Sequence, residues 1–293
     1  MKKILRILIV CMCCVGLLQS CSLMRNPLKI KNYVEVETTS GSFVVGLYQG
    51  TPAHRDNFKE KCSSQFYDGT MLYKSVRNSE YSFGLRDGYT ETKVLESDLK
   101  NEKSLPAEFD ARILPKRGTV AMRRMEGTQN ADKKSDACLF FIVDGGTRVT
   151  EHEVKVATAL KNRDTYKLYI DKFLALPENA SLKDSLNSLG SISTMKQYNE
   201  LYAELMKMVK PQIESDGVEL FSVSEKNIEK YVEKGGVPMF EGYYTVFGEI
   251  SVGMELLDKF SKLETKMDRS PKEKITIVST KVLNKKEFKK KYK

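Results

Sequence analysis

One stretch of the chain, FYDGTMLYKSV (residues 66–76), places a single cation among apolar and aromatic side chains. The composition of this stretch predicts a turn that leads into a strand, with Lys74 on the strand. Two roles are open for this lysine: a charge that acts on a bound group, or a side chain that only extends from a strand to solvent. Which role applies depends on the elements that surround Lys74 in space.

Other kinds of chemistry have little support in the sequence. The chain has only two histidines, His54 and His152, and neither has a cysteine or another histidine at ligand spacing, so we expect no metal site. Neither a Gly-rich phosphate loop nor a serine nucleophile signature is present. We therefore expect a protein that works without a cofactor.

The N-terminus has the pattern of an export signal. A basic region, MKKILR, precedes an apolar run from residue 7 to residue 18 that is too short to span a bilayer. The run ends in LQSC, which resembles the bacterial lipobox, so we expect residues 1–20 to be a signal peptide and Cys21 to carry lipid. An ordinary signal with incidental cysteines is the alternative. The lipobox predicts a lipoprotein of the cell envelope of a Gram-negative bacterium, facing the periplasm, with residues 21–31 as its tether.

Export changes the cysteine and charge balance. Cys62 and Cys138 remain in the body of the chain, either as one disulfide or as an unpaired buried pair, and the sequence leaves both states open. The signal carries three basic residues, so its removal takes the formal net charge from +9 to +6. We expect residues 284–293 to be a solvated basic tail, with contact to an acidic membrane surface or a polyanion as the alternative. Nucleic acid is not an expected partner outside the cytoplasm.

Strand patterns dominate the chain after the tether. Alternating or short apolar segments predict strands at residues 33–39, 42–48, 118–122, 139–143, 244–247 and 275–282. Helices are expected at residues 53–62, which follow Pro52, and at residues 254–260. Many strands with two short helices indicate a mainly β protein and a closed β-barrel.

The order of short motifs along the chain resembles that of the cyclophilin-type peptidyl-prolyl isomerases. The matching segments are TSGSF (39–43), GLY (46–48), TPA (51–53), NF (57–58), FYDGT (66–70), PAEF (106–109), RGTVAM (117–122), FFIV (140–143), EGYYTVFGEI (241–250) and GME (253–255). Each motif alone is weak, but together they keep the family order on both flanks of the chain. The resemblance implies a closed antiparallel eight-stranded β-barrel, built from residues 32–146 and 237–283 and capped by two helices, with a peptide groove on its outer face.

The activity that the resemblance implies is rotation about X-Pro peptide bonds. Amide resonance opposes this rotation with a barrier of about 18–20 kcal/mol, and lowering the barrier needs neither a nucleophile nor a metal. It needs an apolar pocket for the proline ring and a hydrogen-bond donor near the prolyl nitrogen. In the family an arginine supplies that donor, and Lys74 stands at its position, so Lys74 is the candidate catalytic residue. Lysine lacks the planar fork of arginine, so the exchange is not conservative.

The other groove positions match the family only in part. Phe141, Phe240 and Tyr244 fit the positions that form the proline pocket and its rim. Met239 stands where many eukaryotic members carry a tryptophan. Leu139 replaces a glutamine that binds the substrate backbone in the family.

The segment after the expected catalytic strand does not align uniquely. Phe83 or Tyr81 is the candidate for the aromatic wall of the pocket, and Arg86 is a candidate replacement cation. Met122 ends the RGTVAM motif and is expected to border the groove. Residues 123–124, both arginine, occupy small or polar positions of the family and would crowd or charge the groove.

Residues 147–236 have a different pattern and are expected to form a helical insertion. A capping box opens this segment at Thr150, and an apolar stripe from Met195 to Val209 is expected to end at Pro211. Either the stripe packs on itself or on the barrel, or the insertion is an arm that binds a client or partner.

Two functions from different classes follow. The first is a peptidyl-prolyl isomerase that assists the folding of exported proteins at X-Pro bonds, held at the membrane by its lipid anchor. The second is a catalytically degenerate cyclophilin-fold lipoprotein that acts as a protein-binding or chaperone-like module. An isomerase assay on an Ala-Pro peptide separates them.

Overall fold

The chain divides into two units. The computed structural model describes residues 26–100, 104–126, 128–146, 149–189 and 191–293. The first unit comprises the described residues up to Val149 together with Lys230–Lys293, and the second is Thr150–Glu229. The expected signal peptide and Cys21 lie outside the described residues. Among the helices that the structure describes, none is both long enough and apolar enough to cross a membrane.

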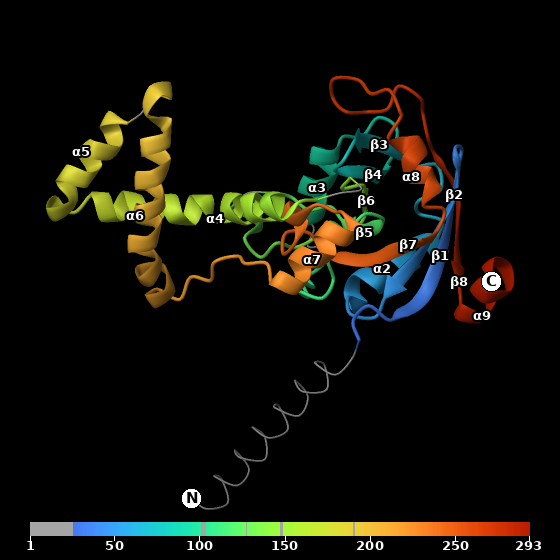
Figure 1. Ribbon diagram of the computed structural model, residues 1–293. Helices are drawn as coiled ribbons and strands as arrows, with labels where there is room; N and C mark the ends of the chain where they lie inside the picture. The colour runs from blue at the N-terminus through green and yellow to red at the C-terminus, as the bar shows by residue number, and fades with distance from the viewer. Residues whose placement is uncertain (1–25, 101–103, 127, 147–148, 190) are drawn as a thin grey trace, which may run out of the picture. The chain divides into compact units, whose positions relative to one another are not determined.

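The first unit is built on one antiparallel sheet (Figure 1). In the described part of the chain its eight strands are β1 Ile30–Thr38, β2 Gly41–Tyr48, β3 Met71–Val76, β4 Glu80–Leu85, β5 Thr119–Met122, β6 Phe140–Val143, β7 Val246–Val252 and β8 Ile277–Leu283. Their order across the sheet is β3-β4-β6-β5-β7-β2-β1-β8. Every strand predicted from the sequence overlaps an observed one, and β4 is the strand that no pattern had predicted.

The expected closed barrel is wrong, because the sheet is open between β3 and β8. The two edge strands meet near their first residues, through an isolated bridge between Met71 and Thr276 and a hydrogen bond from the Leu72 N–H to the Ile275 carbonyl (2.9 Å). Ile277 at the start of β8 also exchanges two backbone hydrogen bonds, each of 2.8 Å, with Gly69 and Thr70 just before β3. Farther along β3, the Ser75 N–H donates to the carbonyl of Arg269, which lies in the loop that precedes β8. The loop therefore occupies the edge that β8 would need in order to close the barrel.

The helices of the first unit are α2 Pro52–Ser63, α3 Glu91–Lys100, α8 Glu255–Phe260 and α9 Lys285–Tyr292. The predicted helices at 53–62 and 254–260 correspond to α2 and α8. His54, Phe58 and Cys62 recur every four residues on α2 and form its buried face. This face lies against β2, β7 and β8, while α8 lies against β2. The two helices thus cover the apolar inside of the sheet.

Glu108 anchors the start of α2. Its carboxylate accepts the backbone N–H groups of Ala53 and His54, each at 3.0 Å, and lies 2.7 Å from His54 Nδ1. Burial alone would raise the pKa of Glu108, but these hydrogen bonds lower it below its ordinary value. The PAEF motif therefore carries a helix cap, a role that its place in the family pattern does not reveal.

Aromatic rings fill the interior of the sheet. Phe58 of α2 lies 5.2 Å from Phe140 and 5.1 Å from Phe247, measured between ring centroids. Cys62 is buried in the same cluster. No disulfide joins Cys62 to Cys138 in the described structure, so the pairing that the sequence left open is not formed.

The C-terminal segment is a docked helix and not a wholly solvated tail. Asn284 caps α9, and Phe288 is buried with its ring stacked on Tyr33 at 3.7 Å. Lys291 and Tyr292 both reach the Glu35 carboxylate, at 2.6 Å each. The many lysines of this segment hide one aromatic anchor, which is enough to hold α9 against β1.

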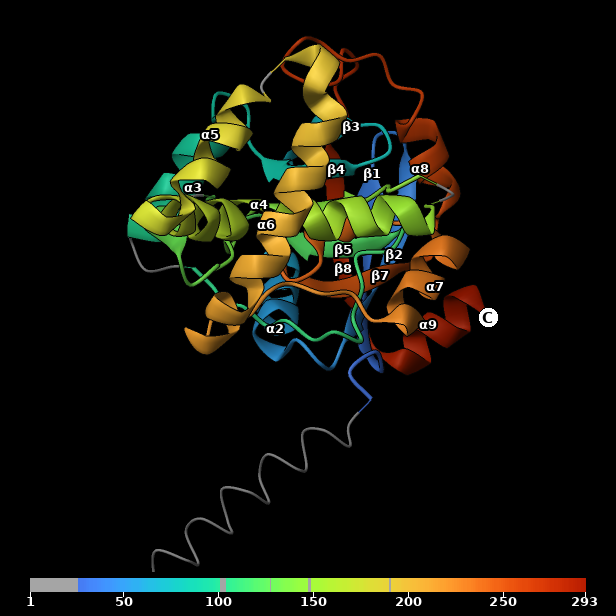
Figure 2. The same cartoon turned by 60° about the vertical axis from the view of Figure 1, so that its left-hand side comes forward.

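The second unit is helical, with α4 Glu151–Leu174, α5 Ala180–Ser188 and α6 Met195–Ser215. Figures 1 and 2 show α6 crossing α4. Thr150 caps α4 in a capping box with Glu153, as the sequence predicts. The next helix, α7 Glu225–Lys234, carries the chain across the boundary between the units.

The apolar stripe of α6 differs from the expected one. Met195 and Met208 are exposed, whereas Leu205, Val209 and Ile213 are buried against α4. The helix also continues through Pro211 to Ser215, so the predicted end at the proline is wrong. Burial of Ile213 beyond the proline favours continuation, since it offsets the one backbone hydrogen bond that proline removes.

Candidate active site

The outer face of the sheet aligns residues from several strands. Lys74 on β3 lies opposite Ser82 on β4, and Ser82 lies opposite Phe141 on β6. Residues two apart on a strand share a face, so Glu80 is on the same face as Ser82. Arg123 directly follows β5, which neighbours β6, and its side chain reaches this face over Phe141. Five positions from four strands therefore meet at one place.

Charged side chains form a connected network on this face. Arg123 Nη1 lies 2.8 Å from Glu80 Oε1, and Arg123 Nε lies 2.6 Å from Glu91 Oε1. Lys74 Nζ lies 3.2 Å from the same Glu80 oxygen. Arg123 and Glu80 are nearly completely buried, while the Lys74 side chain is 27% exposed. Two cations thus share one buried carboxylate, and Arg123 is the more firmly held of the two.

Three aromatic rings lie beneath this network. Phe141 is 5.5 Å from Phe240 and 5.0 Å from Tyr244, both edge to face. The Arg123 guanidinium lies 5.4 Å from the Phe141 centroid and 5.6 Å from the Tyr244 centroid. These are distances at which a guanidinium is attracted to an aromatic ring. Phe141, Phe240 and Tyr244 therefore form one cluster with Arg123, and Lys74 is linked to this cluster through the Glu80 carboxylate.

The electrostatics of the site keep Arg123 charged. Burial by itself lowers the pKa of the guanidinium, but the carboxylate of Glu80, together with other neighbours, outweighs burial and raises it above its ordinary value. Burial also raises the pKa of Tyr244, whose hydroxyl donates to Glu126 at 2.7 Å. At neutral pH the site therefore presents a fixed positive charge and a neutral phenol.

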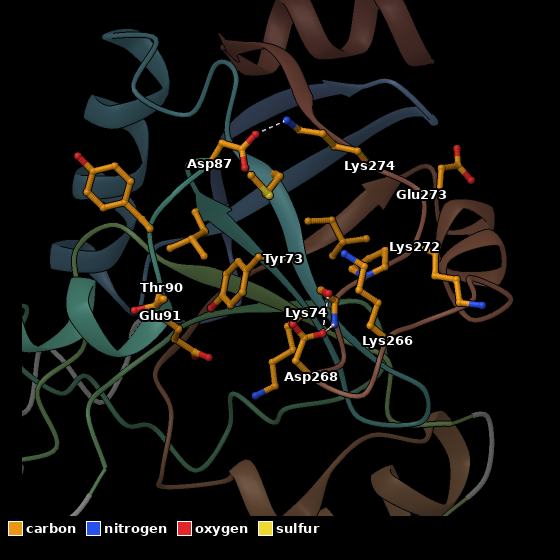
Figure 3. A pocket seen from close by; sticks show the side chains of 16 residues that line it. Tyr73, Lys74, Asp87, Thr90, Glu91, Lys266, Asp268, Lys272, Glu273 and Lys274 are labelled. Carbon is orange, nitrogen blue, oxygen red and sulfur yellow. Dashed lines mark hydrogen bonds and ion pairs between the residues drawn. The ribbon is translucent and has the colours of Figure 1, made fainter.

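A cavity of about 700 Å³ lies beside Lys74. Figure 3 shows Tyr73, Lys74 and Glu91 among the side chains that line it, with the ion pair between Asp87 and Lys274 at its upper rim. The cavity has both apolar and charged walls. Lys74 and Glu91 are common to this cavity and the network, so an extended chain lying in the cavity would meet the network directly.

Not every predicted groove residue lies in the groove. Phe83 and Met122 are completely buried in the interior cluster, where Phe83 stacks on Phe140 at 5.5 Å. Their assignment to substrate binding is corrected, because strand alternation turns them to the inside. Leu139 is also completely buried, in a separate cluster with Tyr73.

Met239 lies beside the aromatic rings of the site, whereas Arg86 lies outside the charged network. Met239 lies in a short 3₁₀ turn, Pro238–Phe240, and is 38% exposed beside the aromatic rings. Arg86 donates to the Phe66 carbonyl at 2.7 Å and so supports the FYDGT turn. It does not belong to the charged network, so it is not a replacement cation there.

Glu80 and Glu91 are the site residues that sequence reasoning missed. The segment EYSFGL (80–85) alternates polar and apolar residues, and this pattern indicates that Glu80 and Ser82 face outward while Tyr81 and Phe83 face inward. Glu91 starts α3 and contacts Arg123, which is 32 positions away in the chain, and no sequence signal predicts that contact. Within the part of the chain that the structure describes, no three His, Cys, Asp or Glu side chains are arranged to hold a metal ion.

Comparison with known proteins gives one family. A family model described as cyclophilin type peptidyl-prolyl cis-trans isomerase/CLD matches residues 33–157 and 222–282, more than half of the chain. Among solved structures the chain is similar to a Cryptosporidium parvum cyclophilin type peptidyl-prolyl cis-trans isomerase, with 12% identity, a TM-score of 0.46, and coverage of 86% of this chain and 97% of that chain. The structure determined in the presence of the dipeptide Ala-Pro gives 12% identity, a TM-score of 0.44, and coverage of 86% and 98%. A comparison with curated proteins finds no match.

Proposed function

Because the chain belongs to the cyclophilin-type peptidyl-prolyl cis-trans isomerase family, we propose that it isomerises X-Pro peptide bonds on the outer face of its sheet. The observation that carries this proposal is the position of Arg123. Its guanidinium is held by Glu80 and Glu91 directly above Phe141, the ring at the pocket position of the family. A fixed donor beside an apolar wall is what the reaction requires.

Arg123 supplies the planar cation that Lys74 cannot. Isomerisation weakens amide resonance and leaves a lone pair on the prolyl nitrogen, which a donor stabilises in the twisted state. The contacts of Arg123 to Glu80 and Glu91 use Nη1 and Nε, and no described residue accepts a hydrogen bond from Nη2. Nη2 is therefore the donor available to a substrate. Lys74 acts as a positioning residue, since it shares the Glu80 carboxylate.

Access to the proline wall requires a side chain to move. Phe141 is completely buried and Tyr244 is 6% exposed, because Arg123 covers them. A proline ring reaches Phe141 only when Tyr244 turns outward, while Arg123 stays paired with Glu80 and Glu91. The slow uncatalysed reaction, with time constants of tens of seconds or more, leaves room for a catalyst that opens only part of the time.

The same covering of Phe141 favours a second candidate function. A pocket that stays closed would leave a cyclophilin fold that binds protein without catalysing isomerisation. The exposed apolar residues of the second unit, such as Leu160, Leu168 and Met208, would then be candidate contact points.

An exchange NMR assay on an Ala-Pro tetrapeptide, with the protein starting after Cys21, tests the proposal. We expect exchange faster than the uncatalysed rate, and a loss of two to three orders of magnitude in Arg123→Gln. Arg55→Gln is the matched control, because Arg55 pairs with Asp56 on α2, away from the site. If the unaltered protein gives exchange only at the uncatalysed rate, the isomerase function is rejected and the protein-binding function remains.

We further propose that the protein acts on proline-containing segments of exported proteins, as a lipoprotein of the cell envelope. The support is the N-terminal pattern that ends at Cys21. Partition of full-length protein between detergent and aqueous phases checks this proposal. Cys21→Ala should move the protein to the aqueous phase, and equal partition of both forms would contradict lipidation.

A further inference from the structure

Arg124 is a buried cation that has no hydrogen-bond acceptor for two of its nitrogens among the described residues. Its residue is only 5% exposed, and its guanidinium lies 4.1 Å from the centroid of the Tyr243 ring. Among the residues that the structure describes, none accepts a hydrogen bond from Nε or Nη1, although both atoms are buried. Burying a charged group without an acceptor is costly, so Nε and Nη1 of Arg124 call for an acceptor from outside the described chain.

The nearby carboxylates are committed to other groups. Glu80 and Glu91 bind Arg123, and Glu126 accepts the hydroxyl of Tyr244. Asp136, whose own N–H donates to the Arg123 carbonyl, accepts the backbone N–H groups of Cys138 and Leu139 through Oδ1. Stacking on Tyr243 attracts the Arg124 charge but supplies no oxygen acceptor. The missing acceptor is therefore not among the acidic residues that surround the site.

Arg124 belongs to the same continuous row of rings as the proposed active site. Tyr243 lies 5.1 Å from Tyr244, and Tyr244 lies 5.0 Å from Phe141. Arg123 covers one end of this row and Arg124 the other. A peptide whose proline is bound at Phe141 would have a flanking residue within reach of Arg124.

We propose that the site selects acidic peptide segments, with Arg124 binding the carboxylate of an Asp or Glu next to the proline. This inference rests on the proposed function, since it assigns a substrate class to that site. A carboxylate fits better than a backbone carbonyl because it brings the opposite charge and two acceptor oxygens to a guanidinium. The basic balance of the chain, with a formal net charge of +6 after removal of the expected signal peptide, also attracts acidic segments.

The test compares peptides that differ only in charge. Fluorescein-labelled Ala-Glu-Pro-Ala, Ala-Gln-Pro-Ala and Ala-Lys-Pro-Ala, together with Ala-Ala-Pro-Glu and Ala-Ala-Pro-Gln, are titrated by fluorescence anisotropy. We expect at least one Glu peptide to bind about tenfold more tightly than its Gln partner, as a charged hydrogen bond allows. The preference should weaken with added salt, because it depends on an ion pair.

Variants of Arg124 separate this role from general binding. Arg124→Gln should bring the Glu-to-Gln affinity ratio to about one, Arg124→Lys should keep part of it, and Arg124→Glu should favour the Lys peptide. Arg55→Gln should keep the full ratio. Thermal melting of each variant shows that the ratio is measured on folded protein.

Two results would overturn the inference: equal affinity for Glu and Gln peptides with the unaltered protein, or a preference that persists in Arg124→Gln. Exchange NMR on the same peptides keeps the two proposals apart. Isomerisation without a charge preference rejects the acidic substrate class and leaves the isomerase. Binding of Glu peptides that depends on Arg124 but causes no isomerisation supports the binding preference and rejects the isomerase.

Discussion

Arg123 Nη1 lies 2.8 Å from Glu80 Oε1, and both side chains are almost completely buried on the outer face of the sheet. The family resemblance predicts a small or polar residue at position 123. The arginine of this chain fills the space that a small side chain would leave open, and it forms an ion pair with Glu80 there. A buried ion pair is expensive to desolvate and contributes little net stability, but each partner depends strongly on the other. The pair therefore holds the geometry of the site more than it stabilises the fold.

We expect the loss of one partner of this pair to cost more than the loss of both. Glu80→Met alone leaves Arg123 with only the Glu91 carboxylate and should lower the free energy of unfolding by about 3 kcal/mol. Glu80→Met with Arg123→Met should lower it by much less, because no uncompensated charge remains. Urea denaturation of the single and double variants measures the difference. Additive losses would contradict coupling between the two side chains.

Lys74 should matter less than Arg123 for catalysis. Lys74→Met removes an ion pair that is partly exposed, which is typically worth up to about 1 kcal/mol, so the isomerase rate should fall by about fivefold or less. Lys74→Arg should keep or raise the rate, since it restores the planar cation of the family. Exchange NMR on an Ala-Pro peptide gives both rates. A larger loss in Lys74→Met than in Arg123→Gln would return the catalytic role to Lys74.

Glu108 should stabilise the start of α2. Glu108→Ala removes the acceptor for the Ala53 and His54 N–H groups and should lower the free energy of unfolding by about 1–2 kcal/mol at neutral pH. Urea denaturation measures this loss. Thr150→Ala, which removes the cap of α4 in the other unit, is a control of the same kind and should leave the α2 region unchanged in hydrogen exchange.

The contribution of Glu108 should also depend on pH. Because its pKa in the folded protein lies below the ordinary value of 4.5, the unfolded chain takes up a proton first as the pH falls. The stabilisation is fully present above about pH 4.5 and is lost as the pH drops below that value through the folded pKa. The stability gap between the unaltered protein and Glu108→Gln should therefore narrow below this pH. A gap that is constant with pH would contradict the role of the charge.

Phe288 should anchor α9 to the sheet. Phe288→Ala removes the ring stacked on Tyr33 and should cost about 3 kcal/mol locally, enough to release a helix of eight residues. The lysines of α9 would then become accessible to trypsin. Limited proteolysis followed by mass spectrometry should show rapid loss of the last residues in the variant and slow loss in the unaltered protein. Glu287→Ala, at the cap, should give an intermediate rate.

Much of the sheet follows from local sequence patterns. β1 and β2 appear as an alternating hairpin with a turn at Gly41, and the four-residue spacing of His54, Phe58 and Cys62 suits a helix with one buried face. β4 also follows a period of two, in which Glu80 and Ser82 alternate with Tyr81 and Phe83, but its segment has no clear counterpart among the family motifs. The same period places the Phe83 ring on the inner face, so the assignment of Phe83 to substrate binding is wrong.

Local patterns could not reveal the open edge of the sheet. Closure depends on whether β8 or the loop before it occupies the edge of β3, and the Ser75 hydrogen bond to that loop decides this. The buried Phe288 is a similar case. The lysine-rich segment of ten residues, 284–293, has the composition of a solvated tail, and only the position of Tyr33 provides a surface for the Phe288 ring.

The amino-acid sequence by itself determined the family and every strand of the sheet except β4, and it named Lys74, Phe141, Phe240 and Tyr244 as candidates for the groove. Only the tertiary structure decided which cation lies over the proline wall. Strand pairing brings Glu80 beside Arg123, and the start of α3 adds Glu91 from a distant part of the chain. The physical reason is that a charge takes its role from the groups that surround it in space, and those groups come from segments whose proximity no local pattern encodes.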